Sequence, residues 1–544
     1  MKYGLKLFMM GPMTGPEKAV SGDGATMQEN HGCRLAEYRR IIRVSVYLLA
    51  LTVWIRLPFF FSILINWDES TNILMGQSIL DGHLPYTELW DLKPPLAFLF
   101  YACAIALLGK SIISVRIAGA FCVALTALLT YGIGRRLLDH RCGLISAMLS
   151  VIAISSIHSG QAVMTEHIAL VPLVGALGVL GTRESDSWTT FSAGILLALA
   201  TFVRLNLAYV SVLAGFFIAA GMYLDPRRSL VRWVSSGVAY AAGGCLVFLC
   251  VFLPYVAAGL PRLWWDSVIR APFRYASSQL SFIEAFREQV SFIQELLSSP
   301  WSPSFGVSVL VWLGGAAGLI AMASRLRKAA GEQKRGLALV GVFLLGTELS
   351  ILSGGAANPH YLIQLVPFMS LSAAALLGAC LNRRARWFIQ TAVLLSCAAS
   401  LLAVVPEYKM TASRIMAGRP LIHGAACDIA DYLKHNSVPG DPIYMMTDHI
   451  VYWLIDAEPL SRSTTHPSNI AKEYLLDVLI GPGTSTASEL SKVLAVKPRY
   501  IVKREQIWYL RTKIPAVRLL EQTIRTHYKH VCSIEGRHIY CRVD

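Results

Sequence analysis

Four charged residues in one short stretch have the types and spacing to act on a hydroxyl group and a phosphate. Asp68 and Glu69 are adjacent acids directly after a long apolar run, and Lys93 follows in ELWDLKPPL, two positions after Asp91. A carboxylate can accept the proton of a hydroxyl, and a lysine is a compact cation suited to a phosphate. Since charges beside a membrane span are costly, a functional role is the default hypothesis for them.

The same residues also have an ordinary structural interpretation. Asp68 and Glu69 could form a solvated helix boundary, and Lys93 could extend to lipid headgroups. Residues 70–80 have an amphipathic pattern suited to a helix lying in the interface, which an Asp-Gly pair ends. Because the acid pair, this helix and the Lys-Pro-Pro sequence occur in one loop, a functional site is the favoured interpretation.

Further polar residues between apolar runs are candidates for the same site. Arg204, in ATFVRLNLAYV, could bind a phosphate bidentately or could be a plain interfacial arginine. His360 and Tyr361 open a later run and are candidate substrate contacts, as is Tyr86. Three other charged residues could equally be structural ion partners: Arg56, Arg116 and Glu348.

A metal site is a weaker possibility. Glu166 and His167, with His158 nearby, could bind a divalent ion, but their spacing is not diagnostic. No other cofactor is indicated.

The composition is that of a polytopic membrane protein. The 544 residues are 54% hydrophobic and only 15% charged, against about 25% charged in soluble domains. A net charge of +15 could suggest nucleic-acid binding, but most basic residues form short clusters between apolar runs, as in loops flanking membrane helices. Nucleic acid is therefore not an expected partner.

Eleven apolar runs are candidate spans, although some are shorter than the usual ~20 residues. They are residues 43–65, 112–134, 142–157, 167–181, 188–203, 205–223, 232–257, 304–323, 336–353, 361–381 and 387–405. Basic clusters precede the first run and follow the second, fourth, sixth, eighth and tenth, so all of them fall on one side of the membrane. This pattern predicts about eleven spans and a cytoplasmic N-terminus.

The count of spans depends on residues 95–108. This apolar run would make only ~20 Å of helix, short of the ~30 Å hydrocarbon core. If it crossed, the basic cluster after residue 134 would move to the outside. We therefore expect a juxtamembrane or re-entrant helix there, which places both Asp68 and Glu166 on the outer side.

The chain divides into three parts. Residues 1–42 are predicted to be a disordered cytoplasmic tail, residues 43–405 a transmembrane domain with its first outer loop at 66–111, and residues 406–544 an outer α/β domain. The final segment alternates like a hairpin around Gly536-Arg537, which would place Cys532 opposite Cys541. A disulfide and two free thiols are both compatible with that register.

The sequences WDES, KPPL and MTEH resemble the membrane-integral glycosyltransferases of the GT-C fold. The similarity is to bacterial protein-mannosyltransferase-like and aminoarabinose-transferase-like proteins, glycosyltransferase families 39 and 83. It is most specific over residues 55–210, and HYLIQLVPF at 360–368 resembles a later outer-face motif. It implies a polytopic α-helical membrane protein with juxtamembrane helices in the first outer loop and a small C-terminal α/β domain.

The resemblance also implies roles for individual residues. Asp68 matches the general base, and Glu69 would orient it or the donor sugar. Glu166 of MTEH matches a second outer-loop acid with a catalytic role, and Lys93 matches the phosphate-binding lysine. Relatives often carry an acid directly before that lysine, whereas Asp91 lies two positions back. We place it on the donor-phosphate side, with Arg204.

The implied activity is glycosyl transfer from a polyprenyl-phosphate-linked sugar to an envelope acceptor on the outer face of a bacterial cytoplasmic membrane. The acceptor could be lipid A, a polysaccharide, a glycolipid or a protein. The main alternative is a transporter or flippase for a lipid-linked glycan, but transporters tend to place polar sites near mid-membrane. A glycan-binding scaffold would leave Asp68 and Lys93 unexplained.

Overall fold

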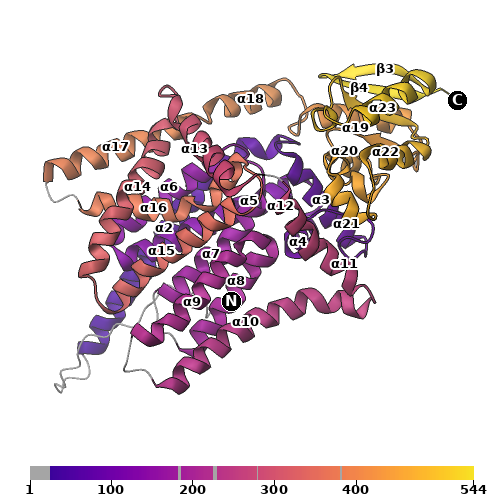
Figure 1. Cartoon of the computed structure of the whole chain (residues 1–544). Coiled ribbons are helices and arrows are strands. Elements are labelled where there is room, and N and C mark those ends of the chain that lie inside the picture. The colour runs from indigo at the N-terminus through magenta and orange to yellow at the C-terminus, as the bar shows by residue number, and fades with distance from the viewer. Residues whose placement is uncertain (1–24, 182–185, 225–228, 279, 380–382, 544) are drawn as a thin grey trace.

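The computed structural model describes residues 25–181, 186–224, 229–278, 280–379 and 383–543. Figure 1 shows a large bundle of helices that carries a small mixed domain at one end, formed by the last part of the chain. We call the end of the bundle that carries this domain the domain end. The structure confirms the fold class predicted from the sequence.

Each apolar run predicted to cross the membrane coincides with a helix. These helices are α2 (Ala25–Arg56), α5 (Ile112–Leu137), α6 (His140–Ser156), α7 (Thr165–Gly181), α8 (Ser187–Val203), α9 (Ala208–Leu224), α10 (Leu230–Ala257), α14 (Phe305–Lys328), α15 (Gly331–Leu352), α16 (Val366–Ala379) and α17 (Arg383–Leu402). Among the described residues, six helical segments are long and apolar enough to cross a membrane. Helices α6 to α9 and α16 have only 14 to 17 residues, so the number of spans stays a prediction.

The predicted disordered tail is too long. Residues 1–24 lie outside the described residues, but α2 begins at Ala25, so the described part of segment 1–42 is helical. A stretch without proline continues this helix into the first apolar run, and Glu37 forms a 2.8 Å ion pair with Arg135 of α5. Of the basic clusters used for orientation, Arg183, Arg227 and Arg228 also lie outside the described residues.

The loop at residues 66–111, which the sequence predicts to lie on the outer side, contains two short helices, α3 (Trp67–Leu80) and α4 (Pro95–Leu108). The Asn66 side chain caps α3 by accepting a hydrogen bond from the Asp68 N–H at 2.8 Å. Helix α4 has the 14 residues expected of a segment too short to cross, and it packs on α3. A Cβ at Gly76 would lie 2.8 Å from the Tyr101 Cβ, so these two helices approach as closely as glycine allows.

The other described elements are mostly short helices in the connections. They are η1 (Leu57–Phe61), η2 (Leu205–Leu207), α11 (Pro261–Trp265), the π-helical turn η3 (Asp266–Arg270), α12 (Ala271–Ser277), α13 (Phe282–Ser298), η4 (Pro359–Gln364), α18 (Val405–Met416), η5 (Arg462–Thr464), η6 (Asn469–Ala471) and η7 (Trp508–Leu510). Helix α18 leads from α17 to the C-terminal domain (Figure 1).

The C-terminal domain is a four-stranded sheet with helices, in the order β1-β2-β4-β3. Strand β1 (Ile443–Met445) is parallel to β2 (Tyr500–Arg504), and β4 (Arg537–Arg542) is antiparallel to both β2 and β3 (Tyr528–Ile534). Its helices are α19 (Ala425–Asn436), α20 (Ile450–Leu454), α21 (Glu473–Leu479), α22 (Thr486–Ala495) and α23 (Ile514–His527). This arrangement agrees with the α/β domain expected for residues 406–544.

The terminal hairpin has a different register from the predicted one. Its turn is Glu535-Gly536 rather than Gly536-Arg537, so Cys532 pairs with Ile539 and Cys541 pairs with Lys529. Arg537 is a strand residue, and its guanidinium binds both carboxylate oxygens of Asp448 at 3.0 and 3.1 Å. The two cysteines are therefore not opposite each other, and both are free thiols.

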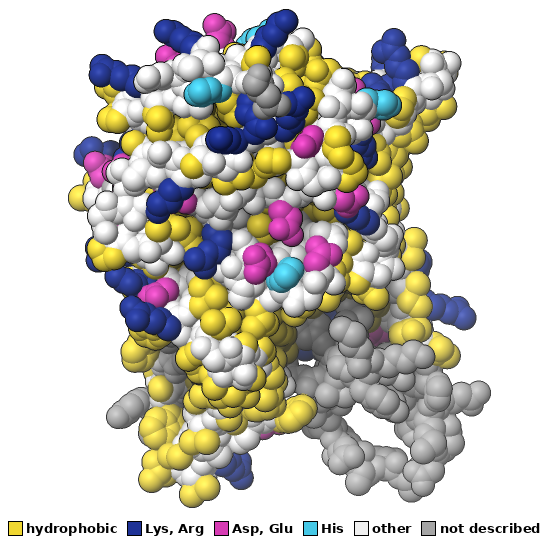
Figure 2. Space-filling model, turned by 90° about the vertical axis from the view of Figure 1, so that its right-hand side faces the viewer, with side chains coloured by type: hydrophobic (Ala, Val, Ile, Leu, Met, Phe, Trp, Pro, Cys, Tyr) yellow, Lys and Arg dark blue, Asp and Glu magenta, His cyan; other side chains and the backbone are white. Residues whose placement is uncertain are grey.

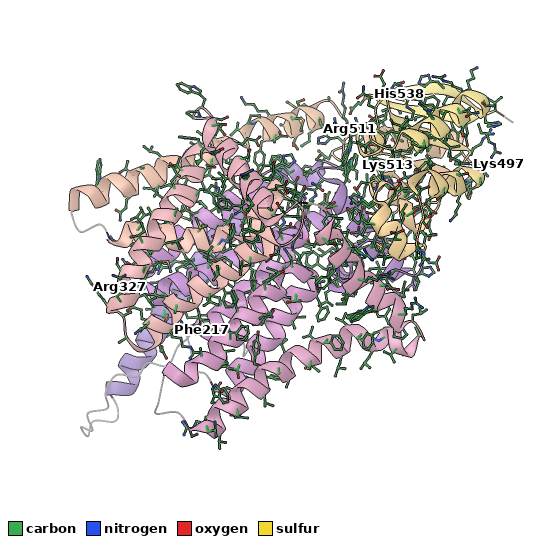
Figure 3. All side chains as sticks on the ribbon, viewed as in Figure 1. Phe217, Arg327, Lys497, Arg511, Lys513 and His538 are labelled. Carbon is green, nitrogen blue, oxygen red and sulfur yellow. The ribbon has the colours of Figure 1, made fainter. Side chains whose placement is uncertain are left out.

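Polar and apolar side chains are separated along the molecule. Figure 2 shows charged side chains gathered over the C-terminal domain and the adjoining surface, with mainly hydrophobic side chains below them. In Figure 3 the labelled basic residues Lys497, Arg511 and Lys513 lie on the C-terminal domain, whereas Arg327 lies at the far end of the bundle. The hydrophobic lower surface is what a membrane-embedded bundle requires.

The packing of α8 on α10 generates a stability prediction. A Cβ at Gly243 would lie 2.2 Å from the Phe191 carbonyl oxygen, whereas nothing lies within 4 Å of one at the next residue, Gly244. We expect Gly243→Val to force the helices apart and to cost about 1–3 kcal/mol. The thermal unfolding midpoint of the purified protein should fall for Gly243→Val and stay near wild type for Gly244→Val. Equal midpoints for the two variants would contradict this close packing.

Candidate active site

Asp68 lies at the start of α3, where side chains from two distant parts of the chain reach its carboxylate. Lys93 Nζ lies 3.4 Å from Asp68 Oδ2, and His466 Nε2 lies 3.1 Å from Asp68 Oδ1. The Ser468 backbone N–H donates to His466 Nδ1 at 3.2 Å, so the imidazole proton is on Nε2 and is donated to Asp68. With 29% of its side chain exposed, Asp68 is accessible to a substrate.

Two cationic or hydrogen-bonding partners keep Asp68 ionised. Burial acts to raise the pKa of Asp68, but Lys93 and then His466 outweigh it and hold the pKa well below its ordinary value. Burial also acts against the charged form of Lys93, whose pKa Asp68 and Asp91 nevertheless hold above its ordinary value. The cluster therefore contains a carboxylate and an ammonium group, both charged at neutral pH.

Asp91 orients Lys93. The Asp91 carboxylate is buried, with Oδ2 3.0 Å from Lys93 Nζ and Oδ1 accepting from the Asn469 amide at 3.4 Å. The predicted donor-phosphate role is not what its contacts indicate, because both oxygens already bind protein groups. Tyr86, a predicted substrate contact, is also buried; its hydroxyl donates to the Lys93 carbonyl at 2.6 Å. Both residues shape the loop that presents Lys93.

A second cluster surrounds Glu166 at the start of α7. Arg204 Nη1 donates to Glu166 Oε1 at 2.6 Å and to Thr165 Oγ1 at 2.9 Å, and its guanidinium lies over the Tyr361 ring at 4.8 Å. His360 Nε2 is 3.7 Å from the same Glu166 oxygen. Arg204 is placed there because α8 ends at Val203, as predicted from the break between apolar runs.

Glu166 itself is completely buried, which argues against direct contact with a reacting group. Its carboxylate instead positions the side chains around it. The Arg204 Nε is buried and has no hydrogen-bond partner among the described residues, while 12% of the Arg204 side chain is exposed and could meet an anion. In this cluster Arg204, His360 and Tyr361 are better placed than Glu166 to meet a substrate.

The two clusters belong to one site. Burial lowers the pKa of His360; Glu166 and Asp68 oppose this shift, and Arg204 and Lys93 add to it. The charges of Asp68 and Lys93, in the first cluster, thus affect the pKa of His360, in the second. Asp68, Lys93, Arg204, His360 and Tyr361 are therefore brought together as the sequence predicted.

Several residues of this site were not found by sequence reasoning. The C-terminal domain contributes His466 and also Lys472, which lies over the Tyr275 ring at 5.4 Å. Burial lowers the pKa of Lys472, and Asp91 and Asp68 oppose this shift, which places a second cation near both acids. The Tyr275 ring in turn contacts Tyr474 edge-on, with 6.3 Å between centroids. His466 and Lys472 lie in a polar stretch without a motif, and Tyr275 and Tyr474 lie in the short helices α12 and α21, so no local signal identified them.

Glu69 differs from its neighbour Asp68. Its side chain is buried, with Oε2 2.7 Å from Arg116 Nη2 and Oε1 accepting from the Val163 N–H at 2.7 Å. Since both oxygens are occupied by protein groups, Glu69 does not lie where it could contact the donor sugar. The sequence-based role for Glu69 is replaced by a structural one, and Arg116 is its ion partner.

Arg116 and Arg56 hold the turn between α6 and α7. Arg116 Nη1 donates to the Gln161 carbonyl at 2.7 Å, and Arg56 Nη1 donates to the Gly160 carbonyl at 2.6 Å. The Val163 carbonyl accepts from the Tyr101 hydroxyl. This turn directly precedes Glu166, so the buried arginines fix the position of the second cluster.

The weak metal candidates do not form a metal site. His167 Nδ1 accepts from the Met164 N–H at 3.1 Å, and its Nε2 is 3.1 Å from the Gly160 carbonyl oxygen, so both ring nitrogens bind the backbone. In the described parts of the chain, no group of three or more His, Cys, Asp or Glu side chains could hold a metal ion. Glu166 and His167 therefore do not fit a divalent-ion site, which the sequence had left as a possibility.

Comparisons with known proteins identify the fold. Residues 92–257 match the family described as dolichyl-phosphate-mannose-protein mannosyltransferase, a segment that includes Lys93, Glu166 and Arg204 but not Asp68. A search of curated proteins found no match.

Solved structures match over nearly the whole chain. A crystal structure of ArnT from Cupriavidus metallidurans bound to undecaprenyl phosphate has a TM-score of 0.60 at 13% identity, covering 93% of this chain and 98% of that one. The apo state of the same protein has a TM-score of 0.57, with the same identity and coverage. The archaeal oligosaccharyltransferase AglB from Archaeoglobus fulgidus, in complex with an inhibitory peptide and a dolichol-phosphate, has a TM-score of 0.46 at 15% identity, covering 93% and 74%. The chain has the GT-C fold that its motifs implied.

The different surroundings of the two adjacent acids generate a prediction. Glu69→Gln leaves the buried Arg116 charge without its partner, which costs about 3–5 kcal/mol. Asp68→Asn should cost far less, because Lys93 keeps its contact with Asp91. In thermal unfolding, we expect a large fall of the midpoint for Glu69→Gln and a small change for Asp68→Asn. A larger fall for Asp68→Asn would show that the structural and accessible roles are reversed.

Proposed function

We propose that this GT-C-fold protein transfers a sugar from a polyprenyl-phosphate-linked donor to an envelope acceptor on the outer face of the cytoplasmic membrane. The observation that carries the proposal is one accessible carboxylate, Asp68, facing several cations at the domain end of a membrane-type bundle. The undecaprenyl phosphate bound to a structure of the same fold supports a polyprenyl-phosphate ligand. Glycosyl transfer from such a donor needs both a base and a site for the departing phosphate.

The cations supply the phosphate site. Lys93 is held in place by Asp91, Arg204 is held by Glu166 and has a free Nε, and Lys472 reaches in from the C-terminal domain. As the bond between the sugar carbon and the phosphate oxygen breaks, negative charge develops on that oxygen. Fixed cations stabilise this charge more in the transition state than in the bound donor, which lowers the barrier.

Asp68 acts on the acceptor. Its carboxylate accepts the proton of the attacking hydroxyl as the new bond forms at the sugar carbon, opposite the leaving phosphate. A low pKa makes Asp68 a weak base toward a free hydroxyl, but the hydroxyl becomes acidic once it begins to bond to an oxocarbenium-like carbon. Transfer of this kind inverts the configuration at the sugar carbon.

His466 positions the base. Its Nε2–H donates to Asp68 Oδ1, which leaves Oδ2 and the remaining lone pairs for Lys93 and the acceptor. Trp90 holds the nearby loop of the C-terminal domain against the bundle, since the Trp90 backbone N–H donates to Thr465 Oγ1 at 3.1 Å. The C-terminal domain thus takes part in the chemistry, with acceptor choice as a further role for its surface.

The clustering of the site at one end favours a transferase over a transporter. The accessible residues lie where α3, η4 and the 461–472 loop of the C-terminal domain meet, rather than at the middle of long helices. A transporter would need its polar site near mid-membrane on broken helices.

Substitution of Asp68 tests the proposal directly. The purified protein would receive a radiolabelled polyprenyl-phosphate sugar and a crude envelope acceptor fraction. We expect Asp68→Asn to lower the transfer rate by about 100-fold or more, because general bases contribute 10²–10⁴-fold. The matched control is Asp81→Asn at the other end of α3. The Asp81 side chain is exposed, and its carboxylate accepts a hydrogen bond from the Gln77 amide. Transfer by Asp68→Asn at the wild-type rate would show that the base is elsewhere.

The same assay would expose the alternative function. If no donor is consumed while a lipid-linked glycan crosses reconstituted vesicles, the protein is a transporter. In that case Asp68→Asn would change the transport rate without any transferred product.

The pH profile tests the role of His466. Because Lys93 and His466 hold the Asp68 pKa well below its ordinary value, wild-type activity should not fall until the pH is strongly acidic. His466→Gln removes one of these contributions and leaves the effect of burial, so the Asp68 pKa rises and the acid limb moves to higher pH. His435→Gln, at an exposed position on α19, should leave the limb unchanged. If His466→Gln lowers activity but leaves the acid limb of the pH profile at the wild-type pH, His466 has only a packing role.

A further inference from the structure

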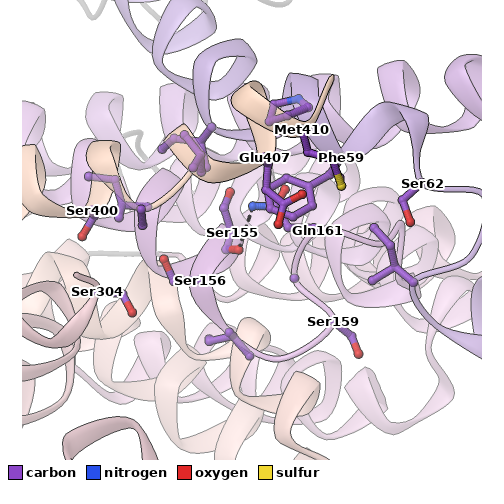
Figure 4. Close-up of a pocket in the computed structure, with 18 of the residues that line it drawn as sticks. Phe59, Ser62, Ser155, Ser156, Ser159, Gln161, Ser304, Ser400, Glu407 and Met410 are labelled. Carbon is purple, nitrogen blue, oxygen red and sulfur yellow. Dashed lines mark hydrogen bonds between the residues drawn. The ribbon is translucent and has the colours of Figure 1, made fainter. Parts of the chain in front are cut away.

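A pocket of about 530 Å³ lies beside the α6–α7 turn at the domain end of the bundle, and Asp68 is not among its lining residues. Its walls come from α2, η1, the end of α6, the turn at 157–161, and the α17–α18 region (Figure 4). This volume falls within the range of roughly 300–1,000 Å³ that small-molecule sites occupy. The proposed transfer chemistry does not use it.

The lining of the pocket is rich in hydroxyl and amide groups. Figure 4 shows Ser400 and Ser304 on one side, Ser62 and Ser159 on the other, and Gln161 and Glu407 between them. The remaining wall contains His423 and is otherwise mainly apolar, including the ring of Phe59. Hydroxyl and amide groups beside an aromatic ring suit a sugar, which has hydroxyl groups at its edges and apolar C–H faces.

Two buried polar atoms in this wall lack partners. The Ser155 hydroxyl and the Gln161 side-chain oxygen are buried and have no hydrogen-bond partner among the described residues. The Gln161 amide nitrogen is engaged, since it donates to the Ser155 carbonyl at 3.0 Å. Leaving a buried polar atom without a partner is unfavourable, so a ligand hydroxyl that bonds to these atoms would be stabilised.

The charge of the lining excludes the donor phosphate. The lining contains no lysine or arginine, and its one carboxylate, Glu407, would repel a phosphate. The cations suited to a phosphate, Lys93, Arg204 and Lys472, do not line the pocket. The pocket therefore suits a neutral group, and Glu407 could accept hydrogen bonds from its hydroxyls.

The pocket is connected to the proposed base through two residues. Ser159 lines the pocket and adopts a left-handed backbone, with φ of 62°. Its hydroxyl accepts from the Asn66 amide at 2.9 Å, and the Asn66 side-chain oxygen in turn accepts from the Asp68 N–H. A ligand in contact with Ser159 would thus contact the cap of the helix that carries Asp68.

We propose that this pocket binds a neutral, hydroxyl-rich sugar, and, resting on the proposed transferase function, that this sugar belongs to the acceptor. The donor phosphate would then bind at Lys93, Arg204 and Lys472, and the acceptor sugar would bind in the pocket. The acceptor class that fits is a glycan or glycolipid with an uncharged sugar near its reacting hydroxyl.

The binding experiment needs neither a donor nor transfer. Wild-type protein in nanodiscs would be labelled with a diazirine derivative of dodecyl maltoside, and, separately, of dodecylphosphocholine, which has the same chain and a charged head. Mass spectrometry would locate the labelled peptides. We expect the maltoside to label segments 155–161 and 400–410, maltose to compete, and phosphocholine to label these segments weakly.

Variants assign the label to the pocket. Ser156→Trp introduces a bulky side chain at an exposed serine of the wall and should abolish maltoside labelling of these segments. Ser324→Trp, at an exposed serine near the other end of α14, should leave labelling unchanged. Equal labelling by both probes, or labelling that survives Ser156→Trp, would overturn the proposal, since the alkyl chain or another surface would then account for it.

A kinetic readout links the pocket to transfer. Ser156→Trp should raise KM for the acceptor and leave KM for the donor unchanged. Unchanged acceptor KM in a variant that has lost maltoside labelling would overturn assignment to the acceptor. Because labelling is measured without any donor, failure of the Asp68 prediction and failure of this one are distinguishable.

Discussion

The buried ion pair between Glu69 and Arg116 is the interaction on which the arrangement of the site depends. It joins α3 to α5, and through the Val163 N–H and the Gln161 carbonyl it also holds the turn that leads into α7. Desolvating two charges is expensive, and the excess hydrogen bonds to the backbone offset that cost. One network thereby determines the positions of both clusters, with Asp68 adjacent to Glu69 on one side and Glu166 on the other.

The consequence is a division of roles between two neighbouring acids. In an α-helix adjacent residues point about 100° apart, so Glu69 faces the interior of the bundle while Asp68 faces the accessible site. Glu69 is fully paired, whereas Asp68 keeps part of its surface exposed between Lys93 and His466. The same logic holds for the second cluster, where buried Glu166 holds Arg204 in place. A buried acid thus holds each of two accessible cations in place: Asp91 holds Lys93, and Glu166 holds Arg204.

Sequence reasoning predicted the helical architecture and the C-terminal α/β domain, because the length and spacing of hydrophobic runs can be read from neighbouring residues. It also named Asp68, Lys93 and Arg204, whose roles in the chemistry stay predictions. It expected Glu69 to orient Asp68 or the donor sugar and Tyr86 to contact the substrate, because chemical type alone does not show which face of an element is buried. It missed His466 and Lys472, whose position follows only from how the C-terminal domain packs on α3. The predicted register of the hairpin was wrong because Glu535 adopts a left-handed backbone conformation in the turn.

The contact between His466 and Asp68 joins positions 398 residues apart in the chain. A ribosome-bound intermediate that already contains every apolar run still lacks this partner, as well as Lys472. The bundle can therefore be inserted into the membrane before the partner that orients the Asp68 carboxylate has been synthesised. In the proposed transferase, the order of translation would therefore delay assembly of the base and the phosphate site until residues 466–472 have followed the bundle.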